Sequence, residues 1–349
     1  MDNSNRIYGR VYLHDLSEET FVQLEGHGSR VIGASASSDG SNFVTTSQDG
    51  KVKIWDSRDG TLLDVIDGFF AEIRDLEFTN DGAYLVVRYA DQSLVLWDYV
   101  LGTKQKTITL DEIYDFVVFP NNDKVGTGSN LEFNIWDINT QEKLFSFEHQ
   151  TNLIKEVAIS PDGRYFVGST APPVSVLYIW DADTGALLDK LGQSFVSDIG
   201  FSPDSKIVGI TTNTYISFTD ISSKRVLRKV NYNSKIANGF AFSPDGKYAA
   251  TYTDSLLSLW NYEDWSLASN YEFDHPIVRL TFSPDSSMIV YHDNEGRRMV
   301  FWDISSEKEV YEMPLTYTFP TFKFSPDGKF FALEEGNSSI TLLGIPTSR

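Results

Sequence analysis

A turn motif that recurs at nearly constant spacing constrains this chain more than any other sequence feature. In its fullest form a phenylalanine or isoleucine precedes Ser-Pro-Asp-Gly or Ser-Pro-Asp-Ser. The eight copies, aligned at the aspartate position, fall 40 to 42 residues apart at Asp39, Asp81, Asn122, Asp162, Asp204, Asp245, Asp285 and Asp327. Proline fixes φ, aspartate hydrogen-bonds within its own turn and glycine accepts a positive φ, so the motif predicts a tight turn. We expect one strand to end before each turn and another to begin after it.

A second motif follows most of the turns. An apolar residue, tryptophan and Asp or Asn occur together at Trp55, Trp97, Trp136, Trp180, Trp260 and Trp302. The fifth copy is degenerate around Phe218, and the eighth has Leu342-Leu343-Gly344. Between the motifs, β-branched and aromatic residues alternate with polar ones, a pattern typical of short strands. No convincing helical periodicity interrupts this pattern, so we predict an all-β repeat with four strands per period.

A period of 40–45 residues with four strands and a Trp-Asp signature is typical of a propeller blade. On these motifs the sequence resembles the WD-repeat β-propeller family over nearly its full length. The resemblance implies an all-β fold, a single domain over residues 1–349 that forms a closed propeller. We expect eight four-stranded blades, with seven blades as the alternative. The expected repeats are about 25–66, 67–109, 110–147, 148–191, 192–230, 231–271, 272–313 and 314–345.

The eighth repeat ends without a fourth strand, which leaves a gap in the last blade. The N-terminal strand Thr20–Leu24 is predicted to complete that blade and so to close the ring. Closure matters because an open propeller would expose unpaired sheet edges. Tyr8–His14 also resembles a third strand of a blade, so it either competes with Ser339–Leu343 for one position or adds a fifth strand.

Composition narrows the classes of partner. Lysine and arginine number 29 against 49 aspartates and glutamates, a net charge of −20 over 349 residues. Nucleic acids and anionic membranes repel such a surface, whereas a protein with a basic face would be attracted. The absence of cysteine excludes disulfides and thiolate zinc sites, and the five histidines show no metal-binding spacing. We therefore expect no cofactor and no metal. The absence of cysteine does not fix the compartment; the expectation for the protein is a cytoplasmic location and a monomeric state on its own.

The first repeat contains residues that, by the family resemblance, form a buried hydrogen-bond relay inside the blade. These residues are His27, Ser47, Asp49 and Trp55. The relay satisfies the indole N–H in an apolar interior, so its role is structural. The same residue types could also make a Ser-His-Asp catalytic triad, but geometry rather than composition defines a triad.

In this family the loops that precede the first strand of each repeat lie on the top face, where partners commonly bind. The candidate partner-binding residues are Arg74, Asp75, Tyr89, Tyr114, Lys155, Phe195, Tyr232, Arg279 and Tyr317. They predict a non-enzymatic scaffold, or a sensor or recruitment module in signalling, that binds a protein or peptide. One alternative is an enzyme or small-ligand or metal binder that uses the central channel, with carboxylates such as Asp75, Glu156 and Asp198 near His292. Another is a purely architectural role in a large assembly.

Overall fold

The structure is a computed structural model, and it contains strands and turns but no helix among the residues it describes. These residues are 11–15, 20–24, 27–29, 31–37, 41–47, 49–57, 59–66, 73–79, 84–98, 103–109, 113–129, 132–148, 154–171, 175–193, 196–232, 237–254, 256–293, 295, 297–315, 321–324, 330–335 and 339–344. In several strands only the backbone path is described. The all-β prediction is confirmed.

The strands fall into two compact units. The middle unit is Asp111–Pro314, and the terminal unit combines Met1–Leu110 with Leu315–Arg349. The middle unit has five four-stranded antiparallel sheets, each built from strands in sequence order. Its sheets are β11 (Asp115–Val118), β12 (Lys124–Gly128), β13 (Glu132–Asp137) and β14 (Lys143–Glu148); β15 (Ile154–Ile159), β16 (Tyr165–Thr170), β17 (Ser175–Asp181) and β18 (Leu187–Gln193); β19 (Val196–Phe201), β20 (Ile207–Thr212), β21 (Tyr215–Asp220) and β22 (Val226–Asn231); β23 (Ala237–Phe242), β24 (Tyr248–Thr253), β25 (Leu256–Asn261) and β26 (Leu267–Glu272); β27 (Ile277–Phe282), β28 (Met288–Asp293), β29 (Arg298–Asp303) and β30 (Lys308–Pro314).

The terminal unit has two four-stranded sheets and one five-stranded sheet. The four-stranded sheets are β3 (Val31–Ala36), β4 (Asn42–Ser47), β5 (Val52–Asp56) and β6 (Leu62–Ile66); and β7 (Ile73–Phe78), β8 (Leu85–Tyr89), β9 (Ser93–Asp98) and β10 (Thr103–Thr109). The five-stranded sheet has the order β2 (Thr20–Leu24), β1 (Val11–Asp15), β33 (Ser339–Gly344), β32 (Phe330–Glu335) and β31 (Thr321–Phe324). Among the described strands, the four-stranded sheets therefore number seven. The expectation of eight four-stranded blades is not supported, because the remaining described sheet has five strands; the seven four-stranded sheets match the seven-blade alternative.

The pairing at the chain ends also differs from the prediction. β1, rather than β2, lies beside β33 and pairs with it in parallel, with Val11 opposite Ile340. β2 pairs antiparallel with β1 at the outer edge of that sheet. The segment that looked like a competitor for the third-strand position thus adds a fifth strand. A parallel neighbour is possible here because the two strands come from opposite ends of the chain and need no crossover connection.

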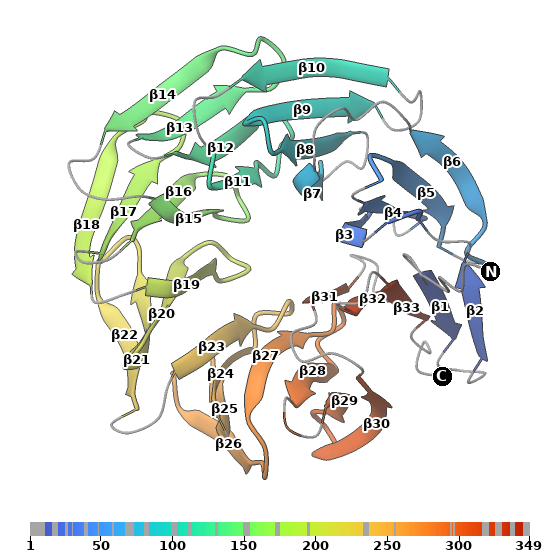
Figure 1. Ribbon diagram of the computed structural model, residues 1–349. Coiled ribbons are helices and arrows are strands. Elements are labelled where there is room, and N and C mark those ends of the chain that lie inside the picture. The colour runs from blue at the N-terminus through green and yellow to red at the C-terminus, as the bar shows by residue number, and fades with distance from the viewer. Residues whose placement is uncertain are drawn as a thin grey trace. The chain divides into compact units, whose positions relative to one another are not determined.

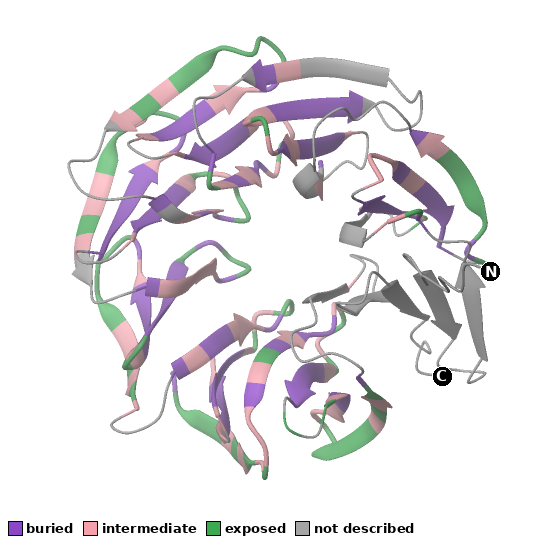
Figure 2. Cartoon of the chain, in the orientation of Figure 1, coloured by how far each residue is buried: buried purple, intermediate pink, exposed green. Residues whose placement is uncertain are grey.

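In the middle unit the first strand of each sheet contacts the first strand of the next, from β11 through β15, β19 and β23 to β27 (Figure 1). We call these five strands the inner strands and the fourth strands, such as β22, the outer strands. The second and third strands carry most buried side chains, and the outer strands carry exposed and intermediate ones (Figure 2). Aromatic residues fill the space between adjacent sheets: Phe133 and Phe166 pack on Trp180, and Phe240 packs edge-on against Phe218.

The Ser-Pro-Asp turns follow the inner strands and are held by hydrogen bonds of their own. In the turn after β19, the Ser202 hydroxyl donates to Asp204 (2.7 Å) and accepts from the Ile207 amide (3.0 Å). Equivalent pairs of bonds form at Ser160, Ser243 and Ser283. The serine and aspartate of the motif thus fix the conformation of each of these turns.

The residue after the turn aspartate links neighbouring sheets. This position has a positive φ, which suits Gly246, but Ser205 (φ 62°) and Ser286 (φ 61°) adopt it too. The left-handed conformation is unfavourable for serine. Each serine hydroxyl compensates by accepting the amide of the preceding turn, from Asp162 to Ser205 and from Asp245 to Ser286, both at 3.0 Å.

Candidate interaction surface

A chain of buried hydrogen bonds runs through the first repeat. His27 Nδ1 lies 3.2 Å from Asp49 Oδ2, and His27 Nε2 lies 2.7 Å from the Thr45 hydroxyl. The same hydroxyl accepts the indole N–H of Trp55 at 2.9 Å. Burial lowers the pKa of His27, although the Asp49 carboxylate acts in the opposite direction. The neutral imidazole therefore donates through Nδ1 to Asp49 and accepts at Nε2 from the Thr45 hydroxyl. Each polar side-chain group in this series of hydrogen bonds then has a partner.

The hydroxyl of this chain belongs to Thr45 and not to Ser47, which corrects the expected relay. Phe43 stands opposite Trp55, so Thr45 is its diagonal neighbour on the same face of the sheet. Ser47 lies two residues farther along and accepts the Asp49 amide instead (3.1 Å). Ser47 and His27 are buried, and the His27 Nε2 atom bonds to Thr45 rather than to Ser47, which excludes a substrate-accessible Ser-His-Asp triad. The same bond joins Trp136 to Thr127 (3.1 Å) and Trp260 to Thr251 (3.0 Å).

Tyr89 also has a different place from the one expected. It is 5% exposed, and its hydroxyl accepts the indole N–H of Trp97 at 2.9 Å. Relative to Trp97, Val87 occupies the position that Thr45 occupies relative to Trp55, and valine has no hydroxyl. The longer side chain of Tyr89 supplies the missing hydroxyl. Tyr89 is therefore part of the blade interior and not a partner-binding residue.

We call the ends at which the inner strands begin the starting edge; Tyr114 and Arg279 lie there in the middle unit. Most inner strands carry an extra residue near their start, where the register to the second strand shifts. Lys155 occupies this position in β15 and Arg74 occupies it in β7 of the terminal unit. Such bulges redirect side chains locally. The side chains of Arg74, Asp75 and Lys155, and all of Phe195 and Tyr317, lie outside the described residues.

The structure describes the side chains of three further candidates, and two of them are exposed. Tyr114 precedes β11 and is 43% exposed, and Arg279 is exposed in β27. Tyr232 is half-buried, packs on the core beside Trp260 and donates its hydroxyl to Thr251 (3.0 Å). Tyr114 and Arg279 are thus available to a partner, whereas Tyr232 is mainly structural.

Arg279 belongs to a polar cluster that the sequence did not single out as a unit. It stands opposite His292, which is 1% exposed, and its charge acts on both His292 and Tyr252. Burial lowers the pKa of His292, so the ring is neutral near pH 7. Burial raises the pKa of Tyr252, and the charge of Asp198 raises it further. The absence of a side chain at Gly239 leaves room for the Tyr252 hydroxyl, a contact that the sequence alone does not show.

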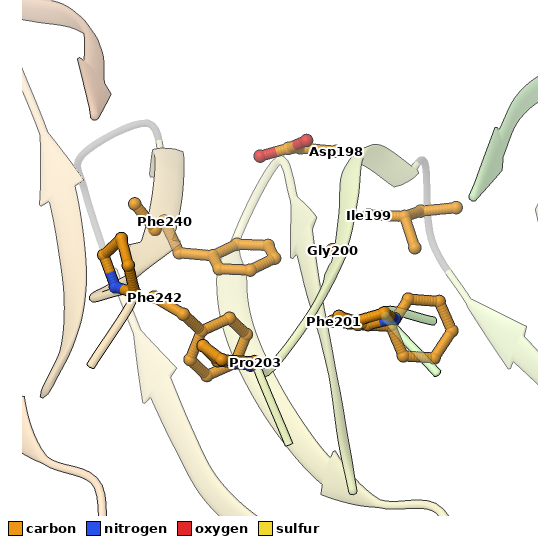
Figure 3. A pocket seen from close by; sticks show the side chains of 10 residues that line it. Asp198, Ile199, Gly200, Phe201, Pro203, Phe240 and Phe242 are labelled. Atoms are coloured by element: carbon orange, nitrogen blue, oxygen red, sulfur yellow. The ribbon is translucent and has the colours of Figure 1, made fainter. Parts of the chain in front are cut away.

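An open hollow of about 470 Å³ extends from Asp198 along β19 and β23 to the turns (Figure 3). Its walls are Ile199, Gly200, Phe201, Phe240, Ala241 and Phe242, together with Pro161, Pro203 and Pro244 of three successive turns. The absence of a side chain at Gly200 leaves the hollow open beside the Phe240 ring. Its volume lies within the range of about 300–1,000 Å³ that is usual for ligand sites. An apolar side chain fits this lining, and a cation fits beside Asp198.

The described residues offer little for metal chemistry. No group of three or more His, Asp or Glu side chains among them could hold a metal ion. His292 is buried behind Arg279 rather than joined to the carboxylates that the channel-enzyme alternative requires. The arrangement supports recognition of a partner by shape and charge.

Comparison with known proteins relates the repeated four-stranded sheets to a known family of repeats. The family model described as "WD domain, G-beta repeat" matches residues 18–56 and 225–261. Both matches end in the third strand of a sheet, at the tryptophan motif. The matched repeats and the relatives named below support a WD-repeat β-propeller family for this chain. WD-repeat proteins typically act as scaffolds that bind other proteins.

Several curated proteins are similar to this WD-repeat chain at about a quarter identity. Autophagy-related protein 16 of Arabidopsis thaliana is 24% identical over 73% of the chain, which spans 52% of that protein. Serine-threonine kinase receptor-associated protein of Dictyostelium discoideum is 24% identical over 74% of the chain and 89% of its own length. Apoptotic protease-activating factor 1 of Rattus norvegicus is 25% identical over 81% of the chain, but only 23% of that protein is covered. The chain thus spans only about half or less of two of these relatives. Within the described part of the chain, no helix is long and apolar enough to cross a membrane.

Proposed function

We propose that this chain is a non-enzymatic scaffold that binds a protein or peptide partner at the starting edge and in the adjoining hollow. The starting edge corresponds to the top face of the propeller. The observation that carries the proposal is the apolar hollow with Asp198 at one end; the exposed Arg279, like Asp198, acts electrostatically on Tyr252. A rigid wall of turns and strands suits recognition because it loses little conformational freedom on binding.

The lining also suggests which partner segment the surface takes. Phenylalanine and proline rings favour an apolar side chain, and Asp198 favours a neighbouring lysine or arginine. The net charge of −20 would steer a basic segment toward the surface and repel acidic competitors. A partner with a basic face therefore remains our expectation.

The proposal extends to the whole chain as one closed ring that acts as a sensor or recruitment module in signalling. The pairing of β1 with β33 supports closure, because it joins both chain ends in one sheet. A cytoplasmic location and a monomeric state stay predictions, to be checked by cell fractionation and by sedimentation.

The test is affinity capture from the native lysate with the intact chain and two variants. Arg279→Ala removes the exposed cation, and Ala241→Phe fills the hollow. A specific partner should be retained by the intact chain and reduced at least tenfold by each variant. The matched control is Lys308→Ala with Val310→Ala on the outer strand β30, which should retain the partner fully.

Two outcomes would overturn the proposal. Equal retention by all variants of the same melting temperature would move the contact away from the starting edge. A rise in melting temperature with a divalent metal or a small molecule, without any captured protein, would favour the channel-ligand alternative.

A further inference from the structure

The outer strand β22 carries a concentration of positive charge that contrasts with the rest of the chain. Residues 222–231 contain Lys224, Arg225, Arg228 and Lys229 and no aspartate or glutamate, although the whole chain has a net charge of −20. We call these four residues the basic edge. They lie within one sheet of the middle unit, at a distance in sequence from the starting edge.

The backbone of β22 has an unpaired side. β21 is its partner on one side, and β22 ends the order of its sheet. Exposed residues of the strand, among them Val226 at 51%, are interspersed with half-buried ones. An outer strand of this kind presents a row of backbone donors and acceptors that an extended segment can pair with.

Aromatic rings hold two of the cations on opposite faces of this edge. The Arg228 guanidinium lies 4.0 Å from the centre of the Trp260 ring in the next sheet. The Lys229 ammonium lies 3.8 Å from the centre of the Tyr215 ring. Successive strand residues point to opposite faces, so cations flank the unpaired backbone on both sides. The cation–π contacts position these groups before any partner arrives.

Most of this charge is not neutralised by the protein. Lys224 reaches Asp189 at 3.7 Å and donates to the backbone carbonyl of Leu188 at 2.7 Å. Arg225, Arg228 and Lys229 form no ion pair within the described part of the chain. Arg225 and Lys229 are exposed beside the unpaired strand and remain available to an anionic partner, whereas Arg228 is half-buried against Trp260.

Protection against aggregation does not account for this concentration. Charged residues on outer strands commonly prevent edge-to-edge association. The neighbouring outer strand β26, Leu267–Glu272, has no lysine or arginine and is equally an outer strand of its sheet. The basic edge thus carries more positive charge than β26, which occupies the same position in its own sheet.

We propose that β22 is a docking strand for an extended acidic segment of a partner protein, which adds to the sheet beside it. Backbone hydrogen bonds between the segment and β22 provide affinity. The basic edge selects segments that carry several Asp or Glu residues. The exposed Val226 adds an apolar contact between the charges. A flexible polyanion such as single-stranded DNA would use the charges without the strand edge. This surface is separate from the starting edge and does not depend on the function proposed there.

The test measures binding of a fluorescein-labelled octapeptide of alternating Glu and Val to the full chain by fluorescence anisotropy. We expect saturable binding that weakens at least tenfold for Arg225→Glu with Lys229→Glu. The control, Arg297→Glu with Lys308→Glu, changes the net charge equally on the β29 and β30 sheet and should change the affinity less than twofold. Equal weakening by both pairs would overturn the proposal, because it would show a non-specific charge effect.

A second measurement uses only the unmodified protein, so it does not depend on how the variants fold. The same peptide with alternate backbone amides N-methylated keeps its charge but loses hydrogen-bond donors. We expect its affinity to fall at least tenfold. Unchanged affinity, or tighter binding of an eight-nucleotide thymidine strand than of the peptide, would instead identify the basic edge as a polyanion surface and overturn strand addition.

Discussion

At the scale of single residues, the strand register decides which hydroxyl serves each tryptophan. Thr45 serves Trp55 because it is the diagonal neighbour across the strand pair, and Tyr89 reaches the same place from two residues farther along. Trp302 lacks this arrangement: its indole N–H is buried without a partner among the described residues. A residue of the right type is therefore insufficient unless the register places it within reach.

The first prediction concerns Thr45→Val, which preserves shape and removes the shared hydroxyl. The free energy of unfolding should fall by about 1–3 kcal/mol, because Trp55 and His27 lose their common partner in a buried site. Urea unfolding followed by tryptophan fluorescence measures this change. Ser47→Ala is the matched control and should cost only about 0.5 kcal/mol, since its Asp49 partner is partly exposed. A larger loss for Ser47→Ala would contradict the assignment.

The second prediction concerns pH. Burial lowers the pKa of both His27 and His292, so the unfolded chain takes up protons that the folded chain does not. The free energy of unfolding should be level above about pH 7 and fall as the pH drops below about 6.5 toward the folded pKa values. Melting temperatures at pH 7.5, 6.5 and 5.5 measure this loss. His292→Gln should reduce the decrease, and an unchanged decrease would exclude a contribution from His292.

These residues show which parts of the structure the local sequence predicts and which it does not. The turn aspartates and the tryptophans could be placed in advance, because each works within a few residues of its own position. Ser47 was preferred to Thr45, and Tyr89 was expected at the surface, because the sequence alone does not give the pairing between strands. Arg279 was a candidate, but its relation to Tyr252 and His292 depends on contacts between distant segments.

At the scale of elements, hydrogen bonds between turns connect neighbouring sheets of the middle unit. Ser205 and Ser286 make these links, and Tyr262 adds another by donating its hydroxyl to Asp204 at 2.6 Å. Burial alone would raise the pKa of Asp204, but the bonds from Tyr262 and Ser202 outweigh it and lower that pKa to about 2. The turns could be predicted from Pro-Asp-Gly chemistry, whereas the links between them could not.

The third prediction separates the two contributions of Ser205 to stability: its hydrogen bond from the Asp162 amide and its left-handed backbone conformation. Ser205→Ala loses the bond from the Asp162 amide and keeps the left-handed backbone, so it should cost about 1 kcal/mol. Ser205→Gly loses the same bond but relieves the backbone, so it should cost less. Urea unfolding of both variants gives the order. A greater cost for glycine than for alanine would show that the left-handed conformation at Ser205 is not a strain in the folded chain.

At the scale of the whole molecule, the two chain ends share one sheet. The sequence indicated that the N-terminal strand Thr20–Leu24 would join the last repeat; β2 is part of that sheet, but β1 lies between it and β33. Both segments have the alternation of an edge strand, so composition could not rank them. The order of the five-stranded sheet depends on long-range pairing.

The fourth prediction concerns removal of residues 1–24, which contain β1 and β2. The truncated chain should melt at a temperature several degrees lower and self-associate, because β33 would present an unpaired edge. Calorimetry and sedimentation velocity measure the two effects. Removal of residues 1–10 alone is the control, since β1 begins at Val11. Equal behaviour of both truncations would contradict a stabilising role for the pairing of β1 with β33.

The pairing of β1 with β33 also sets an order of events during synthesis. More than 300 residues separate Asp15 from Ser339, so the ribosome needs about 15–60 s to deliver the second strand after the first. Throughout that interval the emerging N-terminal strand has no access to its parallel neighbour. Chaperones that shield extended apolar segments would therefore act on this chain at its leading end, until translation reaches the last repeat.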